Sequence, residues 1–212
     1  MNLELDHFFI LVEPGAKVAE RLIALGLTEG APNTHQGQGT SNRRFYFSNS
    51  MLELLWVHDA AEAAGGPAQK LYFPERATDP IASPFGVILH RTDNSSLEMP
   101  FPGWEYQPEY FDPPWAFHIG ANSSDLLEPL CIYAPFVEPR KRTLESGKFR
   151  TISEVLITTP SKPLSDILGI AGAAAGLTIE HGTEHLMEMS FDGRRERRSS
   201  DLRPDLPIIV HW

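Results

Sequence analysis

The sequence predicts an α+β protein built from two related β-α-β-β-β modules with a structured segment inserted between them. An N-terminal strand pattern followed by a helix pattern and a hairpin predicts the first module. The same order of elements near the C-terminus predicts the second, and a proline- and aromatic-rich stretch lies between them. The expected bounds are 1–60, 61–148 and 149–212, all within one structural domain.

The first module begins with a buried strand at residues 3–12, because this short run is rich in aromatic and β-branched residues. A helix is expected next. Apolar residues recur at helical spacing between Pro14, which suits a helix start, and Gly26, which suits its end. Three further strands, the last two joined as a hairpin, are expected at 27–32, 43–47 and 51–57.

The inserted segment is less regular. Strands are expected at 85–90 and 130–133. Residues 99–117 combine prolines with aromatic residues, which makes them too rigid for a linker and too broken for a helix. This stretch either protects a sheet edge or roofs a pocket, and the sequence does not decide between the two.

The second module is expected to repeat the first. A strand at 152–158 precedes a short helix at 164–170, and a hairpin is expected from 178–180 and 186–191. Aligning ISEVLIT with LDHFFIL places Glu154 opposite His7. Aligning LMEMSF with MLELLW places Glu188 opposite Glu53. This pattern predicts an internal duplication.

Composition excludes several classes of function. The 212 residues are 42% hydrophobic, as in an ordinary globular protein, and the net charge of -10 argues against nucleic acid as a partner. The N-terminal sequence lacks a signal peptide and no apolar run could span a membrane, so we expect a cytoplasmic protein without a membrane partner. The single cysteine, Cys131, is interpreted as a buried strand thiol rather than a nucleophile.

Polar residues in the middle of apolar strands are the feature that suggests a site. These are His7, Glu53, Glu154 and Glu188. A carboxylate is costly to bury without a partner, and several on separate strands could converge on one metal ion. Alternatively, the histidine is a hydrogen-bonded core residue and each glutamate faces solvent or pairs with an arginine such as Arg43 or Arg44.

The segments LDHFFILV, NTHQGQGTSNRRFYF, MLELLWV and DLRPDLPIIVHW resemble the glyoxalase-like domain proteins of the vicinal oxygen chelate superfamily. The resemblance implies paired modules that form a cupped mixed sheet. It also implies a histidine ligand on the first strand and a glutamate ligand on the fourth, here His7 and Glu53. The superfamily's second module supplies another histidine and glutamate. This chain offers Glu154 and Glu188 instead, with His118 as a substitute.

The implied cofactor is a divalent metal (Mn, Fe, Mg, Ni or Zn), although a metal-free site stays open. The loop at 33–44 could form a lip of the cup in which His35, Asn42, Arg43 and Arg44 bind substrate, with Trp115 from the aromatic stretch. Alternatively, it is a polar turn whose arginine pairs with Glu53. The later run Arg194, Arg195, Arg197 and Arg198 is interpreted as a solvated loop.

Two functions follow from the resemblance. The first is a metal-dependent isomerase or lyase that stabilises an enolate or related oxyanion, with Glu53 and Glu188 as catalytic residues. The second is a metal-free binding or sequestration protein of the bleomycin-resistance type, whose ligand would contact Trp104, Tyr106, Tyr110, Phe111 and Trp115. Whether Glu53 pairs with an arginine or faces an ion discriminates between them. The partner is a small molecule, and the modules could pair within one chain or across a homodimer.

Overall fold

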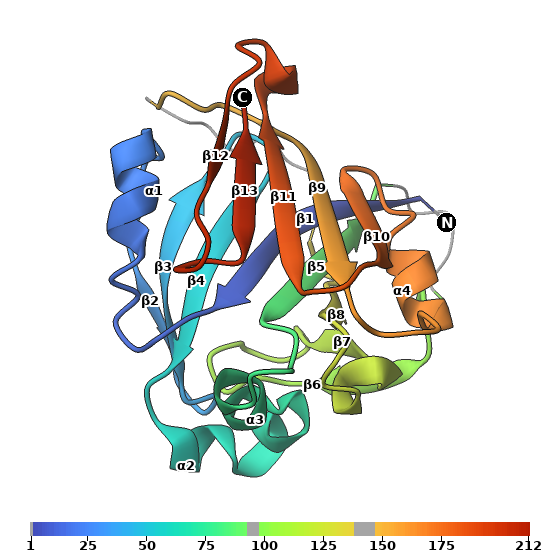
Figure 1. The fold of residues 1–212 in the computed structure, drawn as a ribbon. Coiled ribbons are helices and arrows are strands. Elements are labelled where there is room, and N and C mark those ends of the chain that lie inside the picture. The colour runs from blue at the N-terminus through green and yellow to red at the C-terminus, as the bar shows by residue number, and fades with distance from the viewer. Residues whose placement is uncertain (1, 93–97, 138–146) are drawn as a thin grey trace.

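Two mixed β-sheets pack face to face in the computed structural model, which describes residues 2–92, 98–137 and 147–212 (Figure 1). The large sheet has eight strands in the order β2-β3-β4-β1-β5-β8-β7-β6. Its strands are β1 (Leu3–Leu11), β2 (Asn33–His35), β3 (Thr40–Tyr46), β4 (Met51–Val57), β5 (Phe85–Arg91), β6 (Gly103–Tyr106), β7 (Phe117–Gly120) and β8 (Leu130–Tyr133).

The small sheet has five strands in the order β10-β9-β11-β13-β12. They are β9 (Ile152–Thr159), β10 (Leu177–His181), β11 (Leu186–Phe191), β12 (Ser199–Asp201) and β13 (Ile208–His211). The helices are α1 (Ala19–Leu25), α2 (Ala60–Ala63), η1 (Gly66–Leu71), α3 (Phe73–Thr78), η2 (Ala121–Ser124), α4 (Asp166–Ala171) and η3 (Asp192–Arg194). Within the described residues, none of these helices has the length and hydrophobicity that crossing a membrane requires.

The first module forms largely as predicted. Helix α1 ends at Gly26, whose φ of 105° is the left-handed conformation that glycine adopts most easily. It crosses over between β1 and β4, which run parallel. The strand predicted at 27–32 is wrong: this stretch makes only an isolated bridge from Glu29 to Phe45, and β2 begins at Asn33. Pro32 explains the break, because proline has no amide proton to give to a ladder.

The large sheet contains the second half of a paired arrangement. Strands β5 and β8 run parallel, as β1 and β4 do, and β1 lies antiparallel to β5 at the centre. Phe9 pairs with Glu53 and Ile88 pairs with Ile132, so both parallel pairs have the same offset of 44 residues. The α+β class with paired modules in a cupped mixed sheet is therefore confirmed. The counterpart of the first module comes from residues 85–133, inside the predicted 61–148 insertion. The parts of that insertion at 93–97 and 138–146 lie outside the described residues.

The small sheet differs from the predicted repeat of the first module. The expected hairpin of β10 with β11 is wrong, because β9 lies between them. Strand β10 runs parallel to β9, which requires a crossover, and α4 supplies it. The predicted alignment of β9 with β1 and of β11 with β4 also fails, since β1 and β4 are parallel whereas β9 and β11 are antiparallel. Strands β12 and β13 were not predicted.

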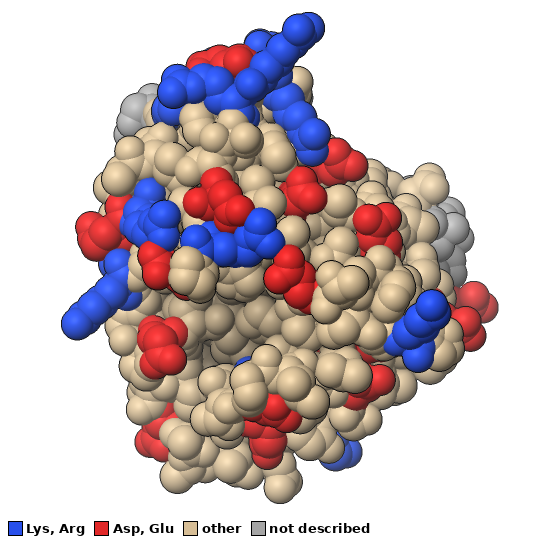
Figure 2. Space-filling view, in the orientation of Figure 1, with Lys and Arg blue, Asp and Glu red and all other residues tan. Residues whose placement is uncertain are grey.

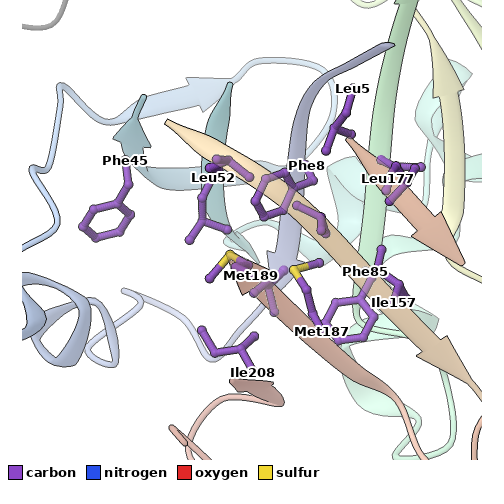
Figure 3. Close-up of a cluster of buried hydrophobic side chains, with 14 of the residues drawn as sticks. Leu5, Phe8, Phe45, Leu52, Phe85, Ile157, Leu177, Met187, Met189 and Ile208 are labelled. Atoms are coloured by element: carbon purple, nitrogen blue, oxygen red, sulfur yellow. The ribbon is translucent and has the colours of Figure 1, made fainter. Parts of the chain in front are cut away.

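The main core lies between the two sheets. Phe8, Leu52 and Phe85 of the large sheet meet Ile157, Met187 and Met189 of the small sheet, and Figure 3 shows these side chains pointing toward one another. Phe47 stacks on Phe191 across the sheets with ring centroids 5.2 Å apart. Burial of these apolar side chains is the dominant stabilising contribution, and it ties the two sheets together.

The opposite face of the large sheet, which we call the cup face, packs against a second hydrophobic cluster. Phe9, Leu55 and Ile88 from the sheet contact Leu71 of η1 and Phe73 at the start of α3. Figure 1 shows α2 and α3 below this end of the sheet. The proline- and aromatic-rich segment at 99–117 contains β6, which is the edge strand of the large sheet. The side chain of Tyr106 in this strand joins the cluster on the cup face.

Candidate functional site

His7 and Glu53 lie on the cup face. Glu53 pairs across the strands with Phe9, whose ring lies in the cup-face cluster. His7 precedes Phe9 by two residues, and an irregularity in the pairing between Leu5 and His7 brings it opposite Ile88, another cup-face residue. Side chains at such diagonal positions on one face are within reach of each other. The structure therefore brings together the two ligands that the resemblance implied for the first module.

The imidazole of His7 is held from one side. Its Nδ1 donates to Oδ2 of Asp6 at 2.5 Å. Because Asp6 accepts at Nδ1, the other ring nitrogen, Nε2, remains for a ligand. Histidines that bind substrates or metals are commonly oriented in this way by a carboxylate.

Glu53 is 8% exposed, and neither nearby arginine neutralises it. Arg43 points to the opposite face of β3 and bonds Glu29 at 2.5 and 2.7 Å, so these contacts raise the pKa of Arg43 and lower that of Glu29. Arg44 lies opposite Glu53 in register but donates from Nε to the carbonyl of Ala31 at 2.7 Å. No described residue forms a hydrogen bond or ion pair with Glu53. The arginine-paired alternative is therefore wrong.

His35 lies at the edge of the cup face on β2. Its Nδ1 is 2.9 Å from Oγ1 of Thr40, and its ring centroid is 5.1 Å from that of Tyr110. Burial lowers the pKa of His35, while the negative charge of Glu53 opposes this shift. The imidazole is thus favoured in its neutral form, which can both accept and donate a hydrogen bond.

Gln38 and two tyrosines form a network that sequence reasoning missed. Oε1 of Gln38 accepts from the hydroxyls of Tyr106 at 3.0 Å and of Tyr110 at 3.2 Å. Burial raises the pKa of both tyrosines, so they stay neutral phenols. The signal in the sequence was the position of Gln38 between two glycines, Gly37 and Gly39. Both glycines adopt positive φ, which tightens the β2-β3 turn and lets the Gln38 side chain reach the two tyrosines.

Asn42 is fully buried on β3. Its Oδ1 accepts from the backbone amide of Asn33 at 2.8 Å, but its Nδ2 has no acceptor among the described residues. Asn42 lies opposite Leu55, two residues from Glu53 on the same face. A buried amide donor without an acceptor is uncommon and requires an explanation.

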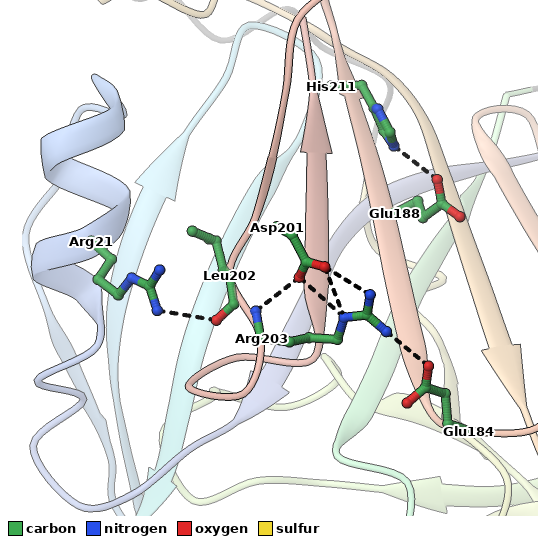
Figure 4. A network of polar contacts seen from close by, with 7 residues as sticks. All are labelled: Arg21, Glu184, Glu188, Asp201, Leu202, Arg203 and His211. Carbon is green, nitrogen blue, oxygen red and sulfur yellow. Dashed lines mark hydrogen bonds and ion pairs between the residues drawn. The ribbon is translucent and has the colours of Figure 1, made fainter.

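The other predicted ligands lie elsewhere. Glu154 and Glu188 project from the outer face of the small sheet, because their neighbours Val155, Met187 and Met189 point into the core between the sheets. Glu188 is 2.8 Å from Nε2 of His211 (Figure 4). These two glutamates and His7 with Glu53 therefore occupy opposite sides of the molecule. They cannot converge on one ion, and Glu188 cannot act with Glu53.

His118 and Trp115 do not join the cup site either. The side chain of His118 turns away from the cup face, where Ile119 lies, and its Nε2 is 2.8 Å from the carbonyl of Phe101. Trp115 is 56% exposed and stacks on Phe136 with centroids 5.8 Å apart. Arg43, described above, is also outside the cup.

The donors on the cup face do not fit a metal centre of the expected kind. The first half supplies His7 and Glu53, but the central cup-face residues of the second half are Ile88 and Ile132. Within the described ranges, no three His, Cys, Asp or Glu side chains are arranged to hold a metal ion. Catalytic zinc sites use three protein ligands, and structural ones use four.

Comparisons with known proteins give one family match and several structures. A model of the glyoxalase-like domain family matches residues 5–94. A hypothetical protein from Staphylococcus aureus has a similar structure, with a TM-score of 0.60, 14% identity and 98% of each chain covered. A mutant 4-hydroxymandelate synthase from Streptomyces coelicolor gives a TM-score of 0.45 at 11% identity, covering 99% of this chain and 62% of that one. No curated protein matches the sequence.

The likeness to the solved structures concerns the fold, because the identities are low. The family match covers β1 to β5, which includes the strands that carry His7 and Glu53. Together with the paired modules of the large sheet, it shows that this chain has the glyoxalase-like fold of the vicinal oxygen chelate superfamily.

Proposed function

We propose that the cup face of the first module binds a small organic molecule through Glu53 and holds no resident metal ion. The state of Glu53 carries this proposal. The residue is 8% exposed beside apolar strand residues, and no described residue pairs with its carboxylate. An isolated carboxylate in such a place is costly, and a cationic or hydrogen-bond-donating group of a ligand would offset that cost.

The neighbouring polar groups favour a ligand with both donors and acceptors. Nδ2 of Asn42 has no acceptor among the described residues, so it can donate to a ligand oxygen. Because Nδ1 of His7 bonds Asp6, Nε2 of the same ring can form a hydrogen bond with a ligand. A few placed polar groups among apolar and aromatic side chains are typical of small-molecule sites.

The rest of the cup face favours an apolar or aromatic body. Phe9, Ile88, Ile132 and Tyr106 belong to the buried cluster on the face that carries Glu53, and the hydroxyls of Tyr106 and Tyr110 bond Gln38 beside it. Aromatic rings bind flat ligands and organic cations well. The proposed ligand class is therefore a small aromatic or aliphatic amine or guanidine.

The rival proposal is a divalent-metal-dependent isomerase or lyase. The shared face of His7 and Glu53 is the observation that favours it. The donor set argues against it, because these two side chains are fewer than the three protein ligands of a catalytic zinc site. We therefore rank the binding function first.

Metal content discriminates between the two proposals. Untagged protein, purified without chelator, should contain far less than one equivalent of Mn, Fe, Ni or Zn, and adding these ions should leave its melting temperature unchanged. The Glu53→Gln variant serves as the control. Near-stoichiometric metal in the wild type that disappears in Glu53→Gln would overturn the metal-free proposal.

Ligand binding can be tested directly by thermal shift. The probes are benzylamine, tyramine and benzamidine, with benzoate and phenylacetate as controls of opposite charge. The cations should raise the melting temperature of the wild type but not of Glu53→Gln, and the anions should raise neither. Equal shifts in both proteins would show that Glu53 does not anchor the ligand and would contradict the proposal.

A further inference from the structure

A polar pocket lies on the outer face of the small sheet, on the other side of the molecule from the cup face. Its volume is about 370 Å³, which is within the usual range for small-molecule sites. It spans β9, β10 and β11 and is bordered by Gly193 and Arg194 of the η3 turn. The lining residues that bear on its chemistry are Ser153, Glu154, Thr178, Ser190, Gly193 and Arg194.

Two serine hydroxyls in the pocket are positioned by bonds in which they accept. The backbone amide of Gly193 donates to Oγ of Ser153 at 2.6 Å, and Nε of Arg194 donates to Oγ of Ser190 at 2.7 Å. A hydroxyl that accepts in this way keeps its own proton to donate. Neither proton has an acceptor among the described residues. The pocket therefore has two placed donors without a partner.

The guanidinium of Arg194 adds further donors. Nη2 lies 3.9 Å from Oε2 of Glu154, which is an ion pair but too long for a hydrogen bond. Its terminal nitrogens make no hydrogen bond to a described residue, and the side chain is about half exposed at 49%. A guanidinium held at Nε with its terminal edge open is well suited to bind the oxygens of an anion.

The turn that carries Arg194 is held in an unusual conformation. Asp192, Gly193 and Arg194 have φ values of 49°, 71° and 55°, all in the left-handed region that favours glycine. The carboxylate of Asp192 holds the turn by accepting from the amides of Arg150 at 3.1 Å and Thr151 at 2.9 Å. Strained residues that the surroundings hold in place are typical of ligand-binding turns.

The charge around the pocket favours an anion. Residues 148–154 and 190–198 contain six lysines and arginines against three carboxylates, in a chain whose net charge is -10. Figure 2 shows Lys and Arg side chains gathered at the end of the molecule where, in Figure 1, β11 leads into η3. Such a local positive field raises the concentration of anions at the surface.

We propose that this pocket binds the phosphate group of a small molecule, with Arg194 and the hydroxyls of Ser153 and Ser190 donating to its oxygens. The donors come from three different segments, β9, β11 and the η3 turn, so they approach a ligand from different directions. A tetrahedral phosphate offers them more acceptor oxygens than a planar carboxylate does. Binding opens the loose ion pair between Arg194 and Glu154. The site is independent of the cup.

Calorimetric titration of the full chain with inorganic phosphate tests this proposal, at constant ionic strength against chloride. The variant is Arg194→Asn, since asparagine tolerates the left-handed conformation, and the matched control is Arg195→Asn on the same turn. Arg194→Asn should weaken phosphate binding at least tenfold and Arg195→Asn less than twofold. Glu53→Gln should bind phosphate as the wild type does. Methyl phosphate, titrated in parallel, distinguishes a phosphomonoester ligand from free phosphate.

Two outcomes would overturn the proposal. Wild-type protein that binds neither phosphate nor methyl phosphate at millimolar concentration has no such site. Equal weakening by Arg194→Asn and Arg195→Asn would assign the effect to the general positive field. The melting temperature of each variant is compared with that of the wild type, and Ser190→Ala, which removes one donor and keeps Arg194, should also weaken binding if a variant at 194 is unstable.

Discussion

Glu188 and His211 contact each other on the small sheet, with 2.8 Å between Oε2 and Nε2 (Figure 4), and their placement matches that of His7 and Glu53 on the large sheet. Glu188 lies two residues before Ser190, the strand partner of His211, just as His7 lies two residues before Phe9, the partner of Glu53. Both pairs join parallel strands, with the residue types exchanged. Glu188 and His211 bond each other, whereas Glu53 has no partner among the described residues.

This contrast predicts different effects of removing the two carboxylate charges. Glu188→Gln should lower the free energy of unfolding by less than about 1 kcal/mol, because its contact with His211 is partly exposed. Glu53→Gln should leave it unchanged or raise it by up to about 1 kcal/mol, since it removes a buried charge without a partner. Urea unfolding at neutral pH measures both. A loss above about 2 kcal/mol in Glu53→Gln would reveal a stabilising partner.

The turn that carries Gln38 predicts a large effect of a single methyl group. Gly39 has φ of 69°, and a Cβ there would lie 2.2 Å from the carbonyl oxygen of Asp59 and 2.6 Å from the amide nitrogen of Ala63. Backbone atoms cannot move aside cheaply. Gly39→Ala should therefore cost more than about 3 kcal/mol in urea unfolding and disturb the tyrosine network.

Gly66→Ala is the matched control for this prediction. Its φ of 51° is also left-handed, but a Cβ there would meet nothing within 4 Å. Its cost should be only the backbone penalty of about 1–2 kcal/mol. If the two substitutions cost the same, the close approach of the β2-β3 turn to α2 does not exist in solution.

His35 predicts a dependence of stability on pH. Burial lowers its pKa in the folded state, so below about pH 6.5 the unfolded chain binds a proton that the folded protein resists. The free energy of unfolding should therefore fall as the pH drops through that region, by at most about 1.4 kcal/mol per pH unit. His35→Gln should lose less stability than the wild type between about pH 7 and pH 5. Parallel losses in the two proteins would contradict a lowered pKa.

Much of the fold could be predicted because its signals are local. Strands β1 and β4 are dense in apolar residues, and Gly26 ends α1 where expected. Which strands pair could not be predicted, because the partner of a strand depends on crossovers and on contacts far along the chain. The similar patterns of β9 and β1 suggested a repeat, although their neighbours run in different directions.

The candidate site could be predicted only as far as its signals are local. His7 and Glu53 were found because a polar residue inside an apolar strand is visible in the sequence. Glu154 and Glu188 have the same local pattern, but which face of a sheet is covered depends on how the layers pack. Gln38 and Tyr110 could not be linked from the sequence, since 72 residues separate them and only the tertiary fold brings them together.

Cys131 predicts the outcome of thiol labelling. It is fully buried in β8, and burial raises the pKa of its thiol to about 12. The thiolate, which is the reactive form, is therefore almost absent near neutral pH. A disulfide reagent such as DTNB should not react with the native protein at about pH 8, and should modify this single thiol once a denaturant unfolds the chain. The rate of any native-state labelling should fall when stability is raised, because reaction then requires opening of the sheet. Rapid stoichiometric labelling of the native protein would instead restore Cys131 as a candidate nucleophile.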